Sequence, residues 1–474
     1  MGEISRNSAV LERAATHAKS YLANVKEASV SASATPEDLR ARLARPLVKS
    51  GMDPARVIDD LVADTAGGIV ATAGGRFYGW VIGGVVPSAL AADWLTSAWD
   101  QNASLHACSP AAAIVEEVCG TWLKDLLGLP AHASFALVTG CQMAHVTCLA
   151  AARSALLSRR GWDVERRGLS GAPPIRMLTG TERHGTIVRA MRLLGLGSDA
   201  IVTLPVDDAG GLDPNALAAV LKESADRPTI VHLQAGDVNT GAFDAFDQLI
   251  PLAHEFNAWV HVDGAFGLWA NVSPKHRHLL AGVEKADSWS SDGHKWLNVP
   301  FDCGYAFVVN PDAHRVSMSY QASYLIRDEG TRDPMDWTPE WSRRARGFAT
   351  YAAIRELGRD GIADLVERTC RHAHDLATRI GALEGAEMIR KPTINQGLVR
   401  FMDPKPGAIE EDHAKWTDEI ISAIVRTGEA FFGGTTWRGK RCMRVSVSSW
   451  QTDGADVDRT VDAVDKVLKR RRAS

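Results

Sequence analysis

The chain has few cysteines, and none of them forms a Cys-x-x-Cys pair. It contains seven cysteines among 474 residues, an odd number scattered along the sequence. This spacing argues against a disulfide framework and against a structural zinc site, and we expect no metal ion. A chain without disulfides suits a reducing compartment, so we expect a cytoplasmic location.

Long apolar runs and an excess of positive charge are also absent. No stretch approaches the roughly 18 uncharged apolar residues that a membrane-spanning helix needs, and the first residues lack the basic and apolar segments of a signal peptide. The formal net charge of −4 provides no global positive field for nucleic acid or for an anionic membrane. We therefore expect neither as a partner. A composition of 45% hydrophobic and 23% charged residues indicates a globular chain with a large core.

Short apolar runs separated by helical stretches begin at residue 134. Apolar runs without alternation are typical of strands covered on both faces, as in a mainly parallel sheet with helices on either side. We expect seven strands, at residues 134–139, 175–179, 201–205, 229–234, 258–263, 288–290 and 305–309. The right-handed crossovers of such a sheet place the carboxyl ends of its parallel strands along one edge, where ligands bind.

Helical patterns flank this sheet on both sides and divide the chain into three units. We expect residues 1–65 to form a helical arm, residues 66–345 a large α/β domain, and residues 346–474 a small α+β domain. In the arm, Thr35 and Pro36 are typical of a helix start. The arm is too small to have its own core, so it should pack on another lobe or on a second subunit. Further helices are expected at residues 87–102, 109–127, 341–356, 362–380, 415–426 and 457–469, and strands of the small domain at residues 396–402 and 444–447.

A glycine-rich segment, residues 74–84, precedes the first helix of the large domain and allows two interpretations. It is an ordinary loop ordered by Phe77 and Trp80, or it is a loop whose backbone approaches a ligand closely. The sequence of this segment alone leaves both interpretations open.

Three polar residues stand at strand ends, on the edge where ligands are expected. His184 follows the second strand, Asp263 ends the fifth, and Lys295 follows the sixth. Taken singly, each has an ordinary explanation as a loop residue, a helix cap or a surface lysine. Together on one edge of one sheet, they indicate a site.

The lysine and the aspartate suit one particular cofactor. A lysine suits covalent chemistry with a carbonyl if burial or a nearby cation brings its pKa below the ordinary value of about 10.4. An aspartate across the cleft suits a cationic ring nitrogen, and pyridoxal phosphate needs both groups. Its phosphate also needs backbone N–H groups at a helix N-terminus. The turn at residues 139–142, followed by an Ala- and Leu-rich helix at residues 143–157, can supply them.

Several longer motifs carry a family resemblance. Ala286-Asp287-Ser288, His294-Lys295-Trp296 and Phe301-Asp302-Cys303 resemble the lysine signature of the group II pyridoxal-phosphate-dependent amino acid decarboxylases, which include the aromatic amino acid and glutamate decarboxylases. Residues 261–267 and 239–244 are similar to two further motifs of that family. The resemblance covers most of the chain and implies an α/β fold of the aspartate-aminotransferase-like type I class.

The resemblance implies a role for each matching position. Lys295 would hold the cofactor through a Schiff base, Asp263 would pair with the ring nitrogen, and Ala265 would pack against the ring. His184 would stack over the ring and help to orient the substrate carboxylate. The phosphate would be surrounded by Gly140, Cys141, Gln142 and His294.

Four further residues are assigned to catalysis or substrate binding. Tyr324 stands at the family's spacing from the lysine for a tyrosine on a closing loop, where its phenol would protonate the carbon that has lost CO₂. Arg444 matches an arginine that some members turn toward a substrate carboxylate, although a structural ion pair explains it equally well. Phe77 and Trp80 would line the pocket together with residues of a partner subunit.

The chain departs from the family pattern around the expected phosphate site. The usual turn, Ser/Thr-Gly-Gly-Ser/Thr-Glu-Ala-Asn, is here Thr139-Gly140-Cys141-Gln142-Met143-Ala144-His145. Asp292 places a carboxylate near the phosphate, where some members have Asn. Backbone contacts survive such changes, whereas a hydroxyl contact is lost.

We therefore predict a cytoplasmic homodimer with its active site at the subunit interface. It would remove the α-carboxylate of an L-amino acid as CO₂, and the aromatic residues of the pocket favour an aromatic substrate. Two other reactions on the same cofactor stay open: a carbon–carbon lyase or aldolase, and an aldehyde-forming oxidative deaminase. A non-catalytic binding relative is the third alternative, and the complete set of Lys295, Asp263 and His184 argues against it.

Overall fold

Seven strands form one large sheet in the middle of the chain. The computed structural model describes residues 3–223, 225–320 and 330–473. The strands lie in the order β1-β7-β6-β5-β4-β2-β3, all parallel except β7, which runs antiparallel to both of its neighbours. This confirms the seven predicted strands and the mainly parallel α/β fold. The strands are β1 (Ser134–Val138), β2 (Arg176–Gly180), β3 (Ile201–Leu204), β4 (Thr229–Gln234), β5 (Trp259–Asp263), β6 (Ser288–Asp292) and β7 (Gly304–Val308).

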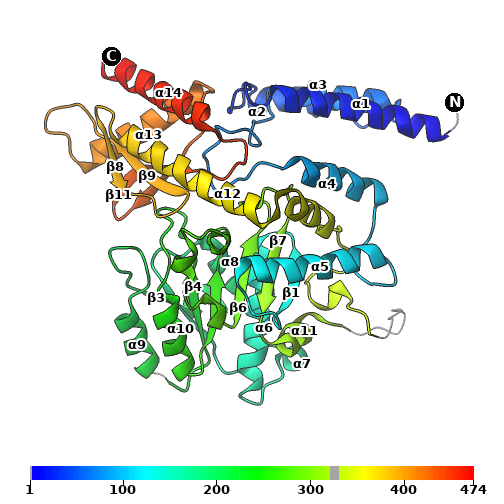
Figure 1. Ribbon diagram of the computed structural model, residues 1–474, viewed down its shortest axis with the longest axis vertical. Helices are drawn as coiled ribbons and strands as arrows, with labels where there is room; N and C mark the ends of the chain where they lie inside the picture. Colours follow the sequence, from blue (N-terminus) through cyan, green and yellow to red (C-terminus); the bar gives the residue numbers. More distant parts are fainter. Residues whose placement is uncertain (1–2, 224, 321–329, 474) are drawn as a thin grey trace.

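Helices cover both faces of this sheet (Figure 1). The central strand β5 is buried along its whole length. Its Trp259 packs in the same core as α6, whereas Val260 and Val262 pack in the core that contains α5 and α10, as the two-residue period of a strand requires. The helices of this domain are α4 (Pro87–Trp99), α5 (Pro110–Leu127), α6 (Cys141–Ser158), α7 (Val164–Arg167), α8 (Gly185–Leu193), α9 (Pro214–Glu223), α10 (Phe246–Glu255) and α11 (Pro311–Met318). Short 3₁₀ helices are η1 (Ser198–Ala200), η2 (Gly267–Val272), η3 (Arg277–Leu280), η4 (Val283–Lys285) and η5 (Pro334–Asp336).

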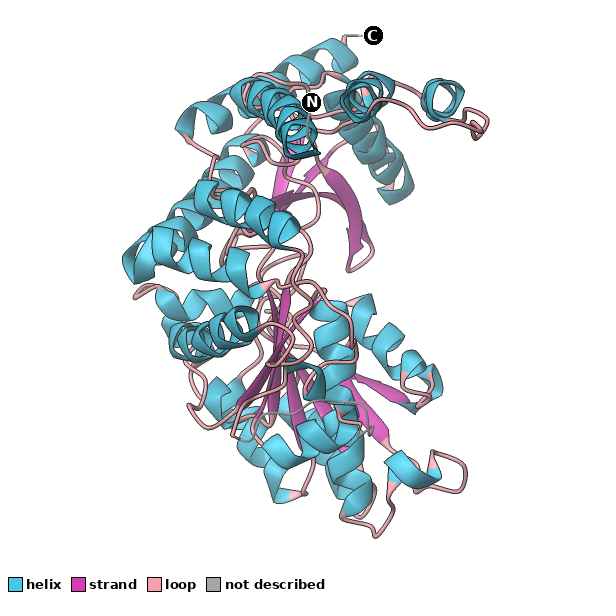
Figure 2. Ribbon diagram, turned by 90° about the vertical axis from the view of Figure 1, so that its right-hand side faces the viewer, coloured by secondary structure: helices cyan, strands magenta, loops and turns pink. Residues whose placement is uncertain are grey.

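A second, antiparallel sheet belongs to the small domain, and Figure 2 shows it above the large one. Its strand order is β10-β11-β9-β8. The sequence predicted β9 and β11 but not β8, which is only half-buried, nor β10, which begins with two glycines, a residue type that strands disfavour. The long helix α12 has a non-helical residue at Gly358, which separates the two helices predicted there. The elements are α12 (Gly347–Gly381), β8 (Ala386–Arg390), β9 (Gln396–Phe401), α13 (Glu410–Arg426), β10 (Gly433–Trp437), β11 (Lys440–Ser446) and α14 (Gly454–Arg472).

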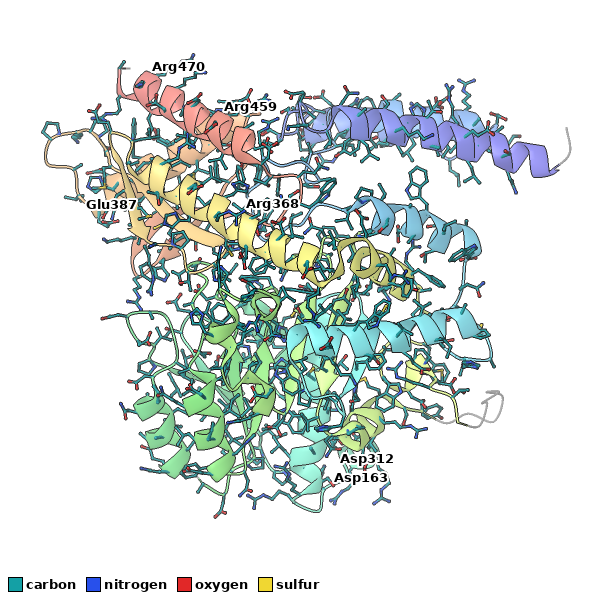
Figure 3. The ribbon with its side chains drawn as sticks, viewed as in Figure 1. Asp163, Asp312, Arg368, Glu387, Arg459 and Arg470 are labelled. Atoms are coloured by element: carbon teal, nitrogen blue, oxygen red, sulfur yellow. The ribbon has the colours of Figure 1, made fainter. Side chains whose placement is uncertain are left out.

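The N-terminal arm consists of α1 (Glu3–Asn24), α2 (Pro36–Leu43) and α3 (Pro54–Thr65). Thr35 caps α2 as predicted, since its side chain accepts the N–H of Asp38. Helices α2 and α3, both described in full, contain no buried residue, so the arm lacks a core of its own. Its base is held by the small domain, where Arg459 (labelled in Figure 3) lies 2.6 Å from Glu27. Among the described residues, none of the helices combines the length and the apolar character needed to cross a membrane.

The glycine-rich segment connects the small domain to the strand ends of the large sheet. Tyr78 donates its N–H to Phe431 and is buried in the core of the small domain. At Gly83 the segment meets the backbone of Lys295, because a methyl group placed there would lie 2.0 Å from the Lys295 carbonyl oxygen. The backbone of the glycine-rich segment therefore closely approaches the backbone of Lys295.

We expect Gly83→Ala to destabilise the protein by about 1–3 kcal/mol, because the added methyl group must displace the backbone of Lys295. The free energy of unfolding, measured in urea, checks this. Gly454→Ala is the matched control, since a methyl group there meets nothing within 4 Å. Equal stability of the two variants would show that the segment moves away from Lys295 without cost.

Candidate active site

One cavity lies at the carboxyl ends of the central strands. Its volume is about 370 Å³, within the usual range for small-molecule sites of roughly 300–1,000 Å³. The parallel pairing of β5 with β6 brings the end of one strand beside the end of the other, and the first turn of α6 also lines the cavity. Eight predicted site residues line this cavity: Gly140, Cys141, Gln142, His184, Asp263, Ala265, His294 and Lys295.

Lys295 is paired with a carboxylate. Its Nζ lies 2.8 Å from Oδ2 of Asp292, which ends β6. Burial lowers the pKa of Lys295, but the charge and the hydrogen bond of Asp292 outweigh burial and raise this pKa above its ordinary value. The sequence-based expectation of a lowered pKa is therefore wrong for the protein without a bound ligand, because the buried partner is an anion rather than a cation.

Asp292 also binds the N-terminus of α6. Its Oδ1 accepts the backbone N–H of Cys141 at 2.6 Å. A protein carboxylate therefore occupies one of the backbone N–H groups of the turn at residues 139–142 that were predicted to bind the phosphate, here called the phosphate cradle. His294 lies beside it, with Nε2 3.7 Å from the same oxygen. Because Nδ1 of His294 accepts the N–H of Cys303 at 3.1 Å, its proton is on Nε2, which faces Asp292.

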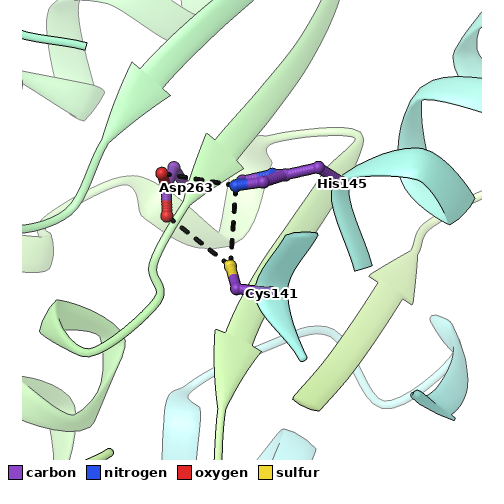
Figure 4. A group of neighbouring side chains, drawn as sticks. All are labelled: Cys141, His145 and Asp263. Carbon is purple, nitrogen blue, oxygen red and sulfur yellow. Dashed lines mark hydrogen bonds and ion pairs between the residues drawn. The ribbon is translucent and has the colours of Figure 1, made fainter. Parts of the chain in front are cut away.

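Asp263 is buried and has two side-chain partners (Figure 4). Oδ2 lies 3.4 Å from Nε2 of His145, and Oδ1 accepts the thiol of Cys141 at 3.8 Å. The Cys141 side chain thus points to this carboxylate, while its backbone N–H faces the cradle. Burial raises the pKa of Asp263, but His145, with smaller contributions from His232 and His184, outweighs burial and holds this pKa well below the ordinary value.

Cys141, His145 and Asp263 are also residue types that bind metal ions, and their ligand atoms lie within 4.8 Å of one another. Each of these atoms already faces a protein partner inside the group, so we interpret the three as a hydrogen-bonded group. His145 was not predicted as a site residue. The sequence signal that could have identified it is its spacing of four residues from Cys141, which places both side chains on one face of a helix.

His184 lies at the mouth of the cavity and caps α8. Its Nδ1 is 2.8 Å from the hydroxyl of Thr186, and its backbone N–H donates to Gln234. Burial and the positive charge of Lys295 lower the pKa of His184, with Asp263 opposing them. The ring is therefore neutral at neutral pH and can present its face to a ligand.

Three predicted residues within the described part of the chain do not line this cavity. Phe77 is buried, with its ring stacked 4.5 Å from that of Phe431, and Trp80 is 59% exposed. The same segment contributes Val81 to the cavity instead. Arg444, on β11, is described below. Tyr324 lies outside the described residues.

Replacing Asp292 by Asn should move the titration of Lys295 to lower pH, because it removes the negative charge that holds the ammonium form. The rate at which an amine-specific reagent modifies Lys295, followed by mass spectrometry across pH in the protein without cofactor, measures this. Asp287→Asn at the other end of β6 is the control and should leave the profile in place. An unshifted profile in Asp292→Asn would assign the raised pKa to another group.

The comparisons with known proteins agree with this geometry. The sequence profile of the pyridoxal-dependent decarboxylase conserved domain matches residues 36–402. The human acidic amino acid decarboxylase GADL1 is 26% identical over 450 residues, 92% of this chain and 85% of that protein. Tryptophan decarboxylase 1 of Oryza sativa subsp. japonica is 29% identical over 388 residues, 76% of this chain and 74% of that protein.

Solved structures show the same fold. The structure of Oryza sativa TDC with PLP and tryptamine superposes with a TM-score of 0.92 at 24% identity, covering 98% of both chains. Mouse CSAD superposes with a TM-score of 0.90 at 21% identity, covering 98% of this chain and 99% of that one.

The residues around the cavity fit pyridoxal phosphate. A lysine amine and a buried carboxylate lie on one cavity, beside a helix N-terminus and the Nε2 proton of His294. Asp292 uses one cradle N–H, so this fit includes a carboxylate that must share the helix N-terminus with a phosphate. As the motifs predicted, the chain belongs to the pyridoxal-dependent decarboxylase family and is a pyridoxal-phosphate-dependent amino acid decarboxylase.

Proposed function

We propose that Lys295 binds the aldehyde of the cofactor covalently, that Asp263 pairs with its ring nitrogen, and that Ala265 packs against the ring. The main observation in support of this proposal is that a lysine and a buried, ionised aspartate line one cavity at adjacent strand ends. Gly140, Gln142 and His294 would contact the phosphate, together with the backbone of Cys141. When bound, the cofactor withdraws electrons from the α-carbon of an attached amino acid and so favours loss of CO₂.

His184 and Arg444 would orient the substrate carboxylate. The neutral ring of His184 lies at the cavity mouth, and the charge of Arg444 is close enough to lower the pKa of that ring. Nη2 of Arg444 donates to Gln396 at 3.2 Å, whereas its buried Nε has no hydrogen-bond partner among the described residues. Burial lowers the pKa of Arg444 to about 10, so it stays cationic at neutral pH. An incoming carboxylate would supply the missing acceptor.

An L-amino acid with an aromatic side chain is the substrate class that the cavity supports best. Its apolar lining comes from Val81, Met143, Val238 and Phe266, which suits a flat apolar side chain. An acidic amino acid is the second candidate, because the cationic side chain of Arg444 would pair with a side-chain carboxylate if His184 alone orients the α-carboxylate. Tryptophan decarboxylase and acidic amino acid decarboxylase, the proteins named above, represent these two classes.

The products would separate simple decarboxylation from the other reactions of this cofactor. A carbon–carbon lyase would release an aldehyde without CO₂, whereas an aldehyde-forming oxidative deaminase would consume O₂ and release CO₂, ammonia, an aldehyde and H₂O₂ in place of the amine. The proposed proton donor for amine formation, Tyr324, rests on its position in the sequence alone. A non-catalytic relative would release none of these products.

The exposed apolar residues of the arm support a homodimer whose active site is completed by the partner subunit. Leu11, Leu22, Val57 and Leu61 lie exposed on α1 and α3, and single exposed apolar residues are ordinary whereas a group on one arm indicates an interface. We further propose a cytoplasmic location, which seven unpaired cysteines support.

Incubating the purified holoenzyme with single L-amino acids should release CO₂ and the matching amine, fastest for aromatic substrates and by about tenfold or more over aspartate and glutamate. Lys295→Ala should lack both products and the visible absorption of the bound cofactor. Lys275→Ala, a surface lysine paired with Glu367, is the matched control and should behave as the parent protein. A visible band that persists in Lys295→Ala would overturn the assignment of Lys295, and faster turnover of acidic substrates would favour the second candidate.

Leu61→Glu should convert a dimer to a monomer and lower activity with it, because the substitution places a charge on the proposed interface, where this leucine is 52% exposed in one chain. Light scattering after size-exclusion chromatography measures the mass. Ile409→Glu is the control, since Ile409 is 62% exposed but precedes α13 in the small domain. A parent protein that elutes as an active monomer would contradict the proposed dimer.

A further inference from the structure

Two residues that depart from the family's phosphate turn meet at the same carboxylate. Cys141 stands where the usual turn has its second glycine, and His145 stands where it has asparagine. Both lie on the first turns of α6, and Figure 4 shows their side chains directed at Asp263. The departures thus change the surroundings of the carboxylate rather than only those of the phosphate.

A chain of hydrogen bonds continues behind His145. Its Nδ1 lies 2.9 Å from Nε2 of His261 on β5, and Nδ1 of His261 lies 2.9 Å from the hydroxyl of Ser288 on β6. The indole N–H of Trp259, which can only donate, donates to that hydroxyl at 2.9 Å. His145 and His261 are completely buried, so the protons of this chain have only protein partners.

The direction of this chain follows from its two ends. Ser288 accepts from Trp259 and can give its own proton to Nδ1 of His261, which leaves the His261 proton on Nε2, facing His145. His145 then accepts at Nδ1 and carries its proton on Nε2, facing Asp263. The opposite direction would place an unprotonated ring nitrogen 3.4 Å from a carboxylate oxygen, with two acceptors and no proton between them.

A second contact is compatible with this direction. The hydroxyl of Ser290 lies 3.2 Å from Nδ1 of His145 and can donate either to it or to the Val262 carbonyl at 3.5 Å. In the direction set by the two ends of the chain, Nδ1 of His145 is an acceptor and its Nε2 is a donor. Burial lowers the pKa of His261 well below the ordinary value, which keeps that ring neutral, as the chain requires.

We propose that His145 is a positioning residue that holds Asp263 ionised and directed at the ring nitrogen of the cofactor, with Ser288 and His261 fixing the place of its proton. The inference rests on the proposed pairing of Asp263 with that nitrogen. A buried carboxylate without such donors would take up a proton itself. A neutral Asp263 would no longer favour the protonated ring nitrogen, which is the form that draws electrons from the substrate.

The test compares His145→Leu, which removes the donor, with His145→Asn, whose amide can still donate to Asp263. The affinity for pyridoxal phosphate is measured by quenching of tryptophan fluorescence, without substrate. We expect His145→Leu to bind about ten- to hundredfold more weakly, the effect of losing one hydrogen bond to a charged group, and His145→Asn to bind within about threefold of the parent protein.

The absorption of the bound cofactor across pH provides a readout that a packing defect would not move. The transition in which the ring nitrogen loses its proton should occur at lower pH in His145→Leu, because the neutralised Asp263 no longer stabilises that proton. The titratable and charged groups that face this carboxylate are Cys141, His145, His184, His232, His261 and Lys295. His314→Leu, which removes another fully buried histidine bonded to Ser134, is the control and should leave affinity and transition unchanged.

Asp263→Asn separates this inference from the proposed role of Asp263. Weak binding in Asp263→Asn with parent-like binding and spectra in His145→Leu would overturn the inference alone. Parent-like behaviour of both variants would overturn the role of Asp263 itself. If His145→Leu does not fold, Ser288→Ala decides: a transition at lower pH supports the hydrogen-bond chain, and an unchanged transition overturns it.

Discussion

The ion pair between Asp292 and Lys295 is the interaction on which the site depends. A half-buried lysine and a buried carboxylate are each costly without a partner, and here the two neutralise one another, with Nζ 2.8 Å from Oδ2. The same carboxylate holds the first N–H of α6, so it fixes the lysine and the helix N-terminus in one arrangement. The pair raises the pKa of Lys295 and so holds the amine as an ammonium ion. An ammonium ion cannot attack a carbonyl until it loses a proton.

The fold supplies this arrangement through close backbone contacts as much as through side chains. A methyl group on Gly304 would lie 2.5 Å from Gly140, so the end of β7 presses against the turn that begins α6. Gly83 presses in the same way on the backbone of Lys295. The small domain reaches the site through that glycine-rich segment, whose Tyr78 is part of the small domain's core. The lysine, the cradle and the second domain are thus coupled by contacts that leave no room for a side chain.

The sequence predicted the large sheet and most of the cavity because these depend on local patterns. Buried strands such as β5 appear as continuous apolar runs, and the residues that end them necessarily meet at one edge. The sequence could not predict the partners of the functional groups, because the fold brings these partners together from distant segments. Lys295 was expected to have a lowered pKa, and only the position of Asp292 on β6 reverses the direction. Phe77 was expected in the pocket from its aromatic character, whereas the ring of Phe431, more than 350 residues away in sequence, accounts for where it lies.

The two carboxylates of the site, Asp263 and Asp292, have different partners. In its proposed role Asp263 must stay ionised in a buried position, and its side chain contacts two donors, the thiol of Cys141 and the imidazole of His145. Asp292 satisfies a lysine and a helix N-terminus, which are the two groups that an aldehyde and a phosphate would need. In the proposed binding mode, the cofactor would therefore exchange one set of charge pairs for another of similar kind, rather than fill an unsatisfied site. The affinity for the cofactor would then be a difference between the free energies of two well-paired states, to which Asp292 contributes in the cofactor-free state and His145 in the bound state.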